Sequence, residues 1–192
     1  METVISNTKV SVKEFRKMMF DDDDNYYYEI INGEMIQKSA PTPIHQRICK
    51  ILLIILDRYV TEKKLGEVLQ SPIDVFLDDY NKPQPDLVFV SNKKKSIITN
   101  DGIMGVPDLI VEIISPTSVI RDRIEKKNLY ERMGVGEYWL IDPQYAAIEI
   151  YSIKKERYEL YSAATILEGK PKTALFEGLT IDLSNIFSTS VS

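Results

Sequence analysis

One stretch, from Pro107 to Pro143, constrains the fold of this chain more than any other. It opens with an apolar, mostly β-branched run at 109–114, which predicts a strand covered on both faces of a sheet. Glu112 interrupts that run. An isolated ionised carboxylate in such a strand would be costly, so Glu112 needs a cation, a proton or hydrogen bonds. The stretch therefore predicts a polar site buried in a sheet.

A helix is expected at about 119–133, after a break at 115–118 whose hydroxyl groups can cap it. At about 100° per residue, the inward stripe of this helix holds Asp122, Lys126, Leu129, Tyr130 and Met133. Lys127 falls in another sector. Lys126 can snorkel to the rim of the stripe. The buried glutamate on the preceding strand instead favours a functional role for it. A second apolar strand is expected at 137–142.

Five phrases follow one another along nearly the whole chain: YEIINGE at 28–34, QPDL at 84–87, PDLIVE at 107–112, Lys126 with Tyr130, and EYWLIDP at 137–143. In this order they resemble the Uma-two family, bacterial restriction-endonuclease-like proteins of the PD-(D/E)XK superfamily. The resemblance implies an α/β (α+β) fold: a mixed central sheet flanked by helices, with an N-terminal hairpin and a C-terminal β-hairpin. It also implies a divalent-metal-dependent endonuclease, a hydrolase that cleaves phosphodiester bonds in DNA.

We expect a single domain over residues 1–192, a length that suffices for one well-filled core. Its parts are an N-terminal helix and hairpin extension (1–40), a nuclease core (41–143) and a C-terminal hairpin and tail (144–192). The patterns predict these elements: a capping box at Ser11 and Glu14, a hairpin over 26–38 around Asn32-Gly33, a helix over 44–63 ended by Gly66, strands at 67–77 and 84–90, and a hairpin over 147–162.

In the superfamily pattern, one strand presents an Asp and its neighbour a Glu two residues before a Lys. By resemblance, Asp86 and Glu112 are the metal ligands, for Mg²⁺ or Mn²⁺. Position 114 is Ile, so Lys126 on the following helix is expected to replace the usual lysine. A divalent ion on two carboxylates neutralises phosphate charge and makes water nucleophilic. The lysine can orient or deprotonate that water and stabilise the transition state.

Other polar residues are candidates for contacts with the substrate or with the ligands: His45, Gln70, Gln84, Asp108, Asp122 and Tyr130. His45 could be a base near neutral pH, or a surface residue in the first turn of its helix. Asp108 shares a strand face with Glu112 but lies about 13 Å away by strand rise, too far to share one ion. It is therefore a strand-end cap or a substrate-side residue. The run Asp21–Asp24 resembles a metal site but favours a solvated loop.

Composition limits the partners and the compartment. The formal net charge of −5 means that DNA binding must rest on a local basic patch and should be weak and salt-sensitive. The single cysteine, Cys49, rules out an intrachain disulfide and a cysteine zinc cluster, and it suits a reducing cytoplasm. No signal segment or bilayer-spanning run is evident, so we expect a cytoplasmic protein without a membrane partner.

Two other functions stay open. The fold could be a catalytically inactive module for nucleic-acid or protein binding, in which Glu112 and Lys126 form only a buried ion pair. It could also be a phosphohydrolase of small nucleotides, which the acidic charge suits. The tyrosines at 26–28, 151, 158 and 161 exceed what one small core hides, which predicts a homodimer.

Overall fold

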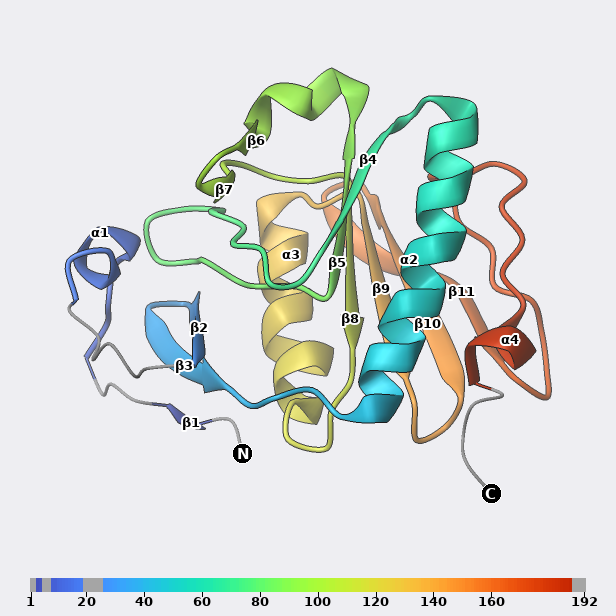
Figure 1. Ribbon diagram of the computed structural model, residues 1–192, viewed down its shortest axis with the longest axis horizontal. Coiled ribbons are helices and arrows are strands. Elements are labelled where there is room, and N and C mark those ends of the chain that lie inside the picture. The colour runs from blue at the N-terminus through green and yellow to red at the C-terminus, as the bar shows by residue number, and fades with distance from the viewer. Residues whose placement is uncertain (1–2, 5–7, 19–25, 188–192) are drawn as a thin grey trace.

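A six-stranded mixed sheet forms the centre of the protein (Figure 1), in a computed structural model that describes residues 3–4, 8–18 and 26–187. Its strand order is β11-β10-β9-β8-β5-β4. The strands are β4 (Gly66–Gln70), β5 (Leu87–Ser91), β8 (Leu109–Ile113), β9 (Glu137–Asp142), β10 (Ala147–Lys154) and β11 (Arg157–Thr165). Only β8 and β9 pair in parallel within this sheet. Because a parallel pair needs a crossover connection, the helix between them packs on one face of the sheet.

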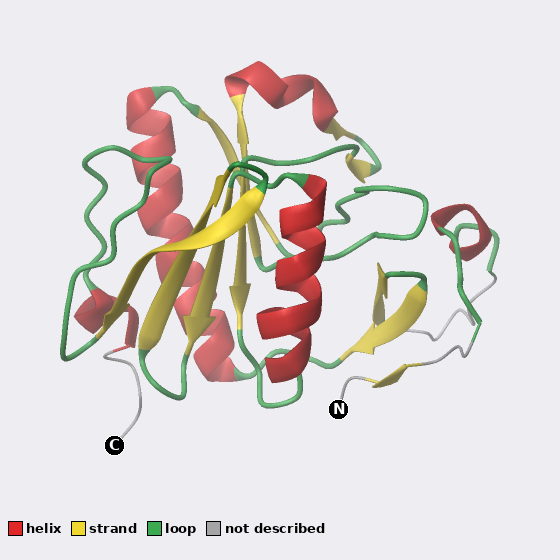
Figure 2. Cartoon of the chain, turned by 180° about the vertical axis from the view of Figure 1, so that it is seen from behind, coloured by secondary structure: helices red, strands yellow, loops and turns green. Residues whose placement is uncertain are grey.

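Helices cover both faces of the sheet (Figures 1 and 2). Helix α2 (Pro43–Lys63) lies on one face and α3 (Lys127–Met133) on the other. The alternation of β8 explains the two layers, since Leu109, Val111 and Ile113 join the core under α2 and Ile110 joins the core under α3. Glu112 therefore faces α3, and α4 (Leu183–Phe187) packs against the α2 core. The mixed sheet flanked by helices confirms the predicted fold class.

The N-terminal hairpin joins a separate three-stranded sheet of order β1-β3-β2. Its strands are β1 (Thr3–Val4), β2 (Tyr27–Ile31) and β3 (Glu34–Lys38). The predicted turn is confirmed, because Asn32 and Gly33 have φ angles of 53° and 85°. Two backbone hydrogen bonds tie the hairpin to the core: Ile30 N donates to Lys82 O at 3.0 Å, and Lys82 N donates to Ile30 O at 2.8 Å. This docking fixes the position of β2 beside α3.

Shorter elements complete the described chain. They are α1 (Val12–Phe15), the 3₁₀ helix η1 (Asn92–Ile97), β6 (Ile98–Thr99) and β7 (Gly102–Ile103). The capping box that opens α1 is confirmed, with Glu14 N donating to Ser11 Oγ at 3.2 Å and Ser11 N donating to Glu14 Oε2 at 2.8 Å. The run Asp21–Asp24 lies outside the described residues.

One predicted helix-ending residue and one predicted strand end were wrong. Helix α2 ends at Lys63 as predicted, but its C-cap is Lys64, with a left-handed φ of 54°, and Gly66 instead opens β4. A Cβ at Gly66 would lie 2.1 Å from Val90 O, so the glycine is needed for close strand packing. The strand expected at 67–77 ends at Gln70 because Pro72 lacks the N–H that would continue the ladder.

The crossover helix is continuous over 119–133 but contains a π-helical segment, η2 (Arg121–Lys126). Such segments are rare and concentrate at functional sites. Asp122 and Lys126 still point inward, as predicted, despite this change of helical pitch: they are 3% and 2% exposed. Leu129 and Tyr130 are also buried. Two charged side chains therefore project from this helix into the protein.

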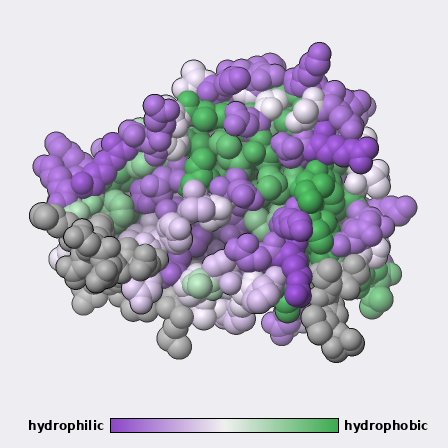
Figure 3. Space-filling model, in the orientation of Figure 1, coloured by the Kyte–Doolittle hydropathy of each residue, from purple (hydrophilic) through white to green (hydrophobic). Residues whose placement is uncertain are grey.

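Tyrosine packing weakens the reason given for a homodimer. The rings of Tyr151 and Tyr158 stack beside that of buried Tyr138, with centroids 6.4 Å and 6.3 Å from it. Part of the aromatic surface is therefore packed within the chain, although Tyr161 is 51% exposed. On the face in Figure 3, apolar surface over α2 is interrupted by hydrophilic side chains. None of the described helices is long and apolar enough to cross a bilayer.

Candidate active site

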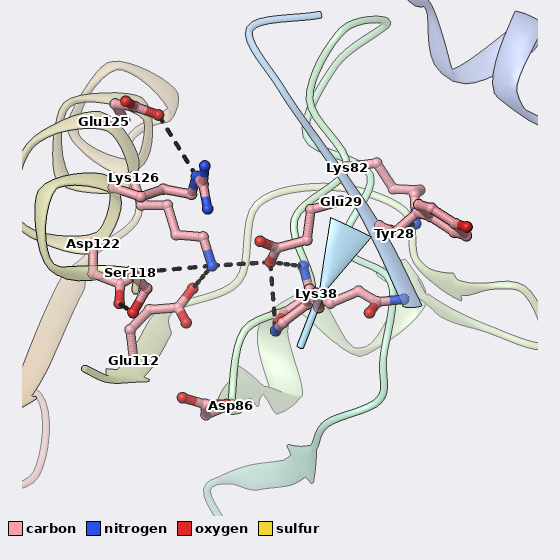
Figure 4. Close-up of polar contacts among 12 residues, drawn as sticks. Tyr28, Glu29, Lys38, Lys82, Asp86, Glu112, Ser118, Asp122, Glu125 and Lys126 are labelled. Carbon is pink, nitrogen blue, oxygen red and sulfur yellow. Dashed lines mark hydrogen bonds and ion pairs between the residues drawn. The ribbon is translucent and has the colours of Figure 1, made fainter. Parts of the chain in front are cut away.

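A lysine surrounded by carboxylates forms the centre of the site (Figure 4). Lys126 Nζ donates to Glu112 Oε1 and to Glu29 Oε1, both at 2.9 Å, and it lies 3.8 Å from Asp122 Oδ1. The Lys126 side chain is 3% exposed. Burial alone would lower the pKa of Lys126, but the carboxylates of Glu112, Glu29 and Asp122 raise it well above its usual value. Lys126 therefore stays protonated at neutral pH and acts as a hydrogen-bond donor and a positive charge.

Glu112 on β8 contacts the crossover helix through only one of its two carboxylate oxygens. Tyr130 OH donates to Glu112 Oε1 at 2.7 Å, the same oxygen that Lys126 binds. Glu112 Oε2 accepts no hydrogen bond from the described residues. Burial raises the pKa of Glu112 to about 8, with Lys126 opposing the rise and Asp122, Asp86 and Glu29 adding to it. This site thus disfavours the Glu112 negative charge unless a further cation is present.

Asp86 stands just before β5, and it lines the same cleft as Glu112. Its Oδ2 accepts hydrogen bonds from Ile113 N at 2.7 Å and from His45 Nε2 at 3.0 Å. Burial would raise the pKa of Asp86, but the His45 contact and other bonds lower it. Figure 4 shows the Asp86 carboxylate on the side of Glu112 that faces away from Lys126. Asp86 Oδ1 has no hydrogen-bond donor among the described residues.

The hairpin contributes two charges that the sequence analysis did not identify as site residues. Glu29 on β2 is fully buried and accepts a hydrogen bond from Gln84 N at 2.7 Å. Burial would raise the pKa of Glu29, but Lys126 and Lys38 lower it to about 2. Lys38 on β3 lies 3.7 Å from Glu29 Oε1 and donates to Gln84 O at 2.7 Å. Glu29 shares a strand face with buried Ile31, a signal that could have indicated its inward position.

A cleft of about 600 Å³ reaches these groups. Asp86, Glu112 and Lys126 line it together, so the structure brings the three predicted catalytic side chains into one cleft. The hairpin, the start of α2 and the loop 115–118 form its walls. The same residues are almost buried, with exposed fractions of 6%, 3% and 2% for the whole residue. The three predicted catalytic groups therefore lie on the floor of the cleft and not on the surface.

The other candidates divide into those at the cleft and one outside it. His45, Gln70, Gln84 and Asp122 line the cleft, and Tyr130 touches it only through Glu112. Ser118 Oγ donates to Asp122 Oδ2 at 2.5 Å, and burial raises the pKa of Asp122 to about 6 despite Lys126. Asp108 is absent from the cleft lining. It accepts from Ser91 N at 2.7 Å and pairs with Lys94 at 3.1 Å, as a strand-end residue does.

The donor set fits one divalent ion. Four buried carboxyl groups face the lysines Lys38 and Lys126; they are those of Glu29, Asp86, Glu112 and Asp122. Asp86 and Glu112 each keep one oxygen without a protein donor among the described residues. Within that same part of the chain, no three His, Cys, Asp or Glu side chains are grouped to hold a metal. Two carboxylates with several waters is the usual environment of Mg²⁺.

Comparison with known proteins gives a family and a fold. The model of the family described as "Uma2: Putative restriction endonuclease" matches residues 12–184. A crystal structure of a "putative nuclease belonging to DUF820" from Anabaena variabilis superposes with a TM-score of 0.72 at 20% identity, covering 93% of this chain and 98% of that one. The type IIG restriction endonuclease BpuSI gives a TM-score of 0.42 at 14% identity, over 79% of this chain and 17% of that one. A comparison with curated protein sequences gives no match.

Proposed function

The chain belongs to the Uma2 family, and from that membership we propose that it is a divalent-metal-dependent nuclease that hydrolyses phosphodiester bonds in DNA. One observation carries the proposal: Asp86 from the turn before β5, Glu112 from β8 and Lys126 from the crossover helix converge on the floor of one cleft. Asp86 and Glu112 would hold Mg²⁺ or Mn²⁺ through their unengaged oxygens. When bound, such an ion neutralises phosphate charge and lowers the pKa of a water.

The chain's own residues would then orient and stabilise the reacting groups. Lys126 stays protonated, so its role is to donate hydrogen bonds to the phosphate or the attacking water and to stabilise the negative charge that develops. Tyr130 donates to Glu112 and holds it in place, and Glu29 accepts from Lys126 and positions the ammonium group. His45 orients Asp86 through the bond at 3.0 Å. The proposal therefore assigns electrostatic stabilisation to Lys126.

A cleavage assay with matched lysine variants tests this assignment. Wild type, Lys126→Ala and Lys127→Ala are incubated with plasmid and oligonucleotide DNA in Mg²⁺ or Mn²⁺, and the cleavage rate is measured. Loss of one preorganised donor typically lowers kcat by roughly 10²–10³. Lys127→Ala should stay close to wild type, because Lys127 Nζ lies 4.0 Å from the Tyr151 ring centroid and does not line the cleft. Equal rates for wild type and Lys126→Ala would reject the role of Lys126.

The near-complete burial of Glu112 and Lys126 supports a second candidate, an inactive nuclease-fold module. In that case the ion pair is only structural. Isothermal titration with Mn²⁺ separates the two. Binding that Asp86→Asn abolishes is expected of the nuclease, whereas no binding to wild type together with no cleavage is expected of the module.

A further inference from the structure

The catalytic groups lie too deep for a rigid duplex. Asp86, Glu112 and Lys126 are each at most 6% exposed as residues, on the floor of a cleft of about 600 Å³. A volume of this order encloses one small ligand. A DNA duplex is much larger and stiff, since its major groove alone is about 12 Å wide and its persistence length is about 150 base pairs. An unpaired strand can bend into the cleft and bring one phosphate to Asp86 and Glu112.

The charge of the cleft also limits how many phosphates it can hold. Its lining contains three lysines: Lys38, Lys50 and Lys126. Lys126 is paired with carboxylates at 2.9 Å, and Lys38 lies 3.7 Å from Glu29. Among the described residues, no carboxylate lies within ion-pair distance of Lys50. Proteins that bind a duplex through its backbone commonly make six to ten phosphate contacts, and this cleft has cations for about two or three.

The basic cluster 93–95 does not supply the remaining phosphate contacts that a duplex would need. It follows the far end of β5 from Asp86, in η1, and is absent from the cleft lining. A strand of five residues spans about 17 Å at the usual rise. Lys94 is moreover paired with Asp108 at 3.1 Å. A phosphate at the catalytic groups is therefore served by the cleft lysines and not by this cluster.

One aromatic ring is placed to receive a base. Tyr27 lines the cleft, is 55% exposed and stands opposite Lys38 in the β2–β3 register. No aromatic ring of the described residues packs on Tyr27. The apolar lining nearby includes Pro41, Pro72 and Pro116. Exposed aromatic rings beside a backbone-binding groove are the usual means of holding unpaired bases without reading their sequence.

We infer that the cleft takes an unpaired nucleic-acid strand, with one base stacked on Tyr27 and the adjoining phosphate beside Asp86 and Glu112. This inference rests on the proposed nuclease function and narrows its substrate. Unpaired DNA and unpaired RNA share the chemistry that the cleft recognises, namely a base, a sugar and one flexible phosphodiester.

Cleavage of matched oligonucleotides tests the inference. One 20-nucleotide sequence is supplied as single-stranded DNA, as blunt duplex DNA and as RNA, with Mn²⁺. The value of kcat/KM for single-stranded DNA or RNA should exceed that for the duplex at least about tenfold. Tyr27→Ala should lower it about ten- to a hundredfold, and Tyr27→Phe, which keeps the ring, should lower it less. Tyr161→Ala, which removes a tyrosine of similar exposure on β11, should leave it unchanged.

Binding without turnover separates this inference from the nuclease function. Fluorescence anisotropy of the same oligonucleotides in EDTA should show single strands bound more tightly than the duplex, and Tyr27→Ala should weaken that binding. The slope of log K against log salt should be about −1.4 to −2.1, as expected for two or three phosphates on a single strand. Such binding without any cleavage would overturn the nuclease function alone. Equal cleavage and binding of duplex and single strand would overturn the inference. So would turnover confined to thymidine 5′-monophosphate p-nitrophenyl ester, or an unaffected Tyr27→Ala.

Discussion

Glu29 and Glu112 bind the same ammonium group, yet neutralising them should have opposite effects on stability. Burial and nearby like charges raise the pKa of Glu112 to about 8, whereas Lys126 and Lys38 overcome the burial of Glu29 and lower its pKa to about 2. Between pH 4.5 and 8 an unfolded chain releases the Glu112 proton and the folded metal-free chain keeps it. The free energy of unfolding therefore falls as pH rises through this window.

The magnitudes follow from these values. The difference between 4.5 and about 8 makes the ionisation of Glu112 cost roughly 5 kcal/mol of folding free energy once pH exceeds 8. The difference between 4.5 and about 2 makes ionised Glu29 contribute roughly 3 kcal/mol, present above pH 4.5 and lost as pH falls towards 2. Glu112→Gln keeps an acceptor for Tyr130 and Lys126, and Lys126 keeps Glu29. Glu29→Gln places an amide nitrogen where buried Glu29 Oε2 has no partner.

Urea denaturation in EDTA from pH 5 to 9, followed by the fluorescence of buried Trp139, measures both effects. Glu112→Gln should match wild type near pH 5 and become more stable than it by several kcal/mol at pH 9. Glu29→Gln should be less stable than wild type by about 3 kcal/mol across the range. Mn²⁺ at a hundredfold excess over Kd should stabilise wild type by about 2.7 kcal/mol and Glu112→Gln not at all.

One pattern refutes this reasoning. If Glu112→Gln loses roughly 3–5 kcal/mol at every pH, Glu112 is the essential partner of a sealed ion pair. Parallel pH profiles for wild type and Glu112→Gln would likewise show that Glu112 is ionised in the folded protein without metal.

Two further predictions concern other parts of the molecule. Glu137 accepts hydrogen bonds from Trp139 Nε1, Thr173 Oγ1 and the backbone N–H groups of Ala174 and Leu175, at 2.7–2.9 Å. Glu137→Gln replaces one carboxylate oxygen, which accepts from these groups, by an NH₂ group, which cannot accept. The free energy of unfolding measured by urea denaturation should fall by about 1–3 kcal/mol. The substitution should also speed proteolysis at 170–180, and unchanged proteolysis would show that Glu137 does not anchor this segment. The homodimer stays a prediction: light scattering at micromolar concentration should give twice the 22.1 kDa of one chain, and a monomer mass rejects it.

Charges inside apolar patterns could be located from the sequence. Glu112 stands in a continuous apolar run, and local periodicity indicated that it points inward. Periodicity put Lys126 in the inward stripe of its helix, and the buried glutamate favoured a functional role over snorkelling to the rim. The structure places both on the cleft floor. The π-helical segment η2 was not predictable in the same way, because hydrophobic spacing does not report a change in backbone hydrogen bonding.

Glu29 illustrates what local patterns do not reveal. Its hairpin was predicted correctly, but its burial depends on contacts with residues more than fifty positions further along, such as Lys82 and Gln84. The end of β4 at Gln70 was missed for a different reason. Alternating apolar residues continue past Pro72, although the proline ends regular pairing there. Tertiary docking thus determines the burial of Glu29, and the missing N–H of Pro72 determines the end of β4.

The ion pair between Glu29 and Lys126 joins positions 97 residues apart, and this separation has a consequence for the newly made chain. At about 5–20 residues per second, a ribosome adds Lys126 roughly 5 to 20 s after Glu29. For most of that interval the hairpin holds only Lys38, one of the two cations that compensate Glu29 in the folded protein. A chain that ends between positions 112 and 126 has Asp86, Glu112 and Lys38 but lacks Lys126. Assembly of the charged cluster therefore waits until Lys126 has been added, well after the hairpin has been made.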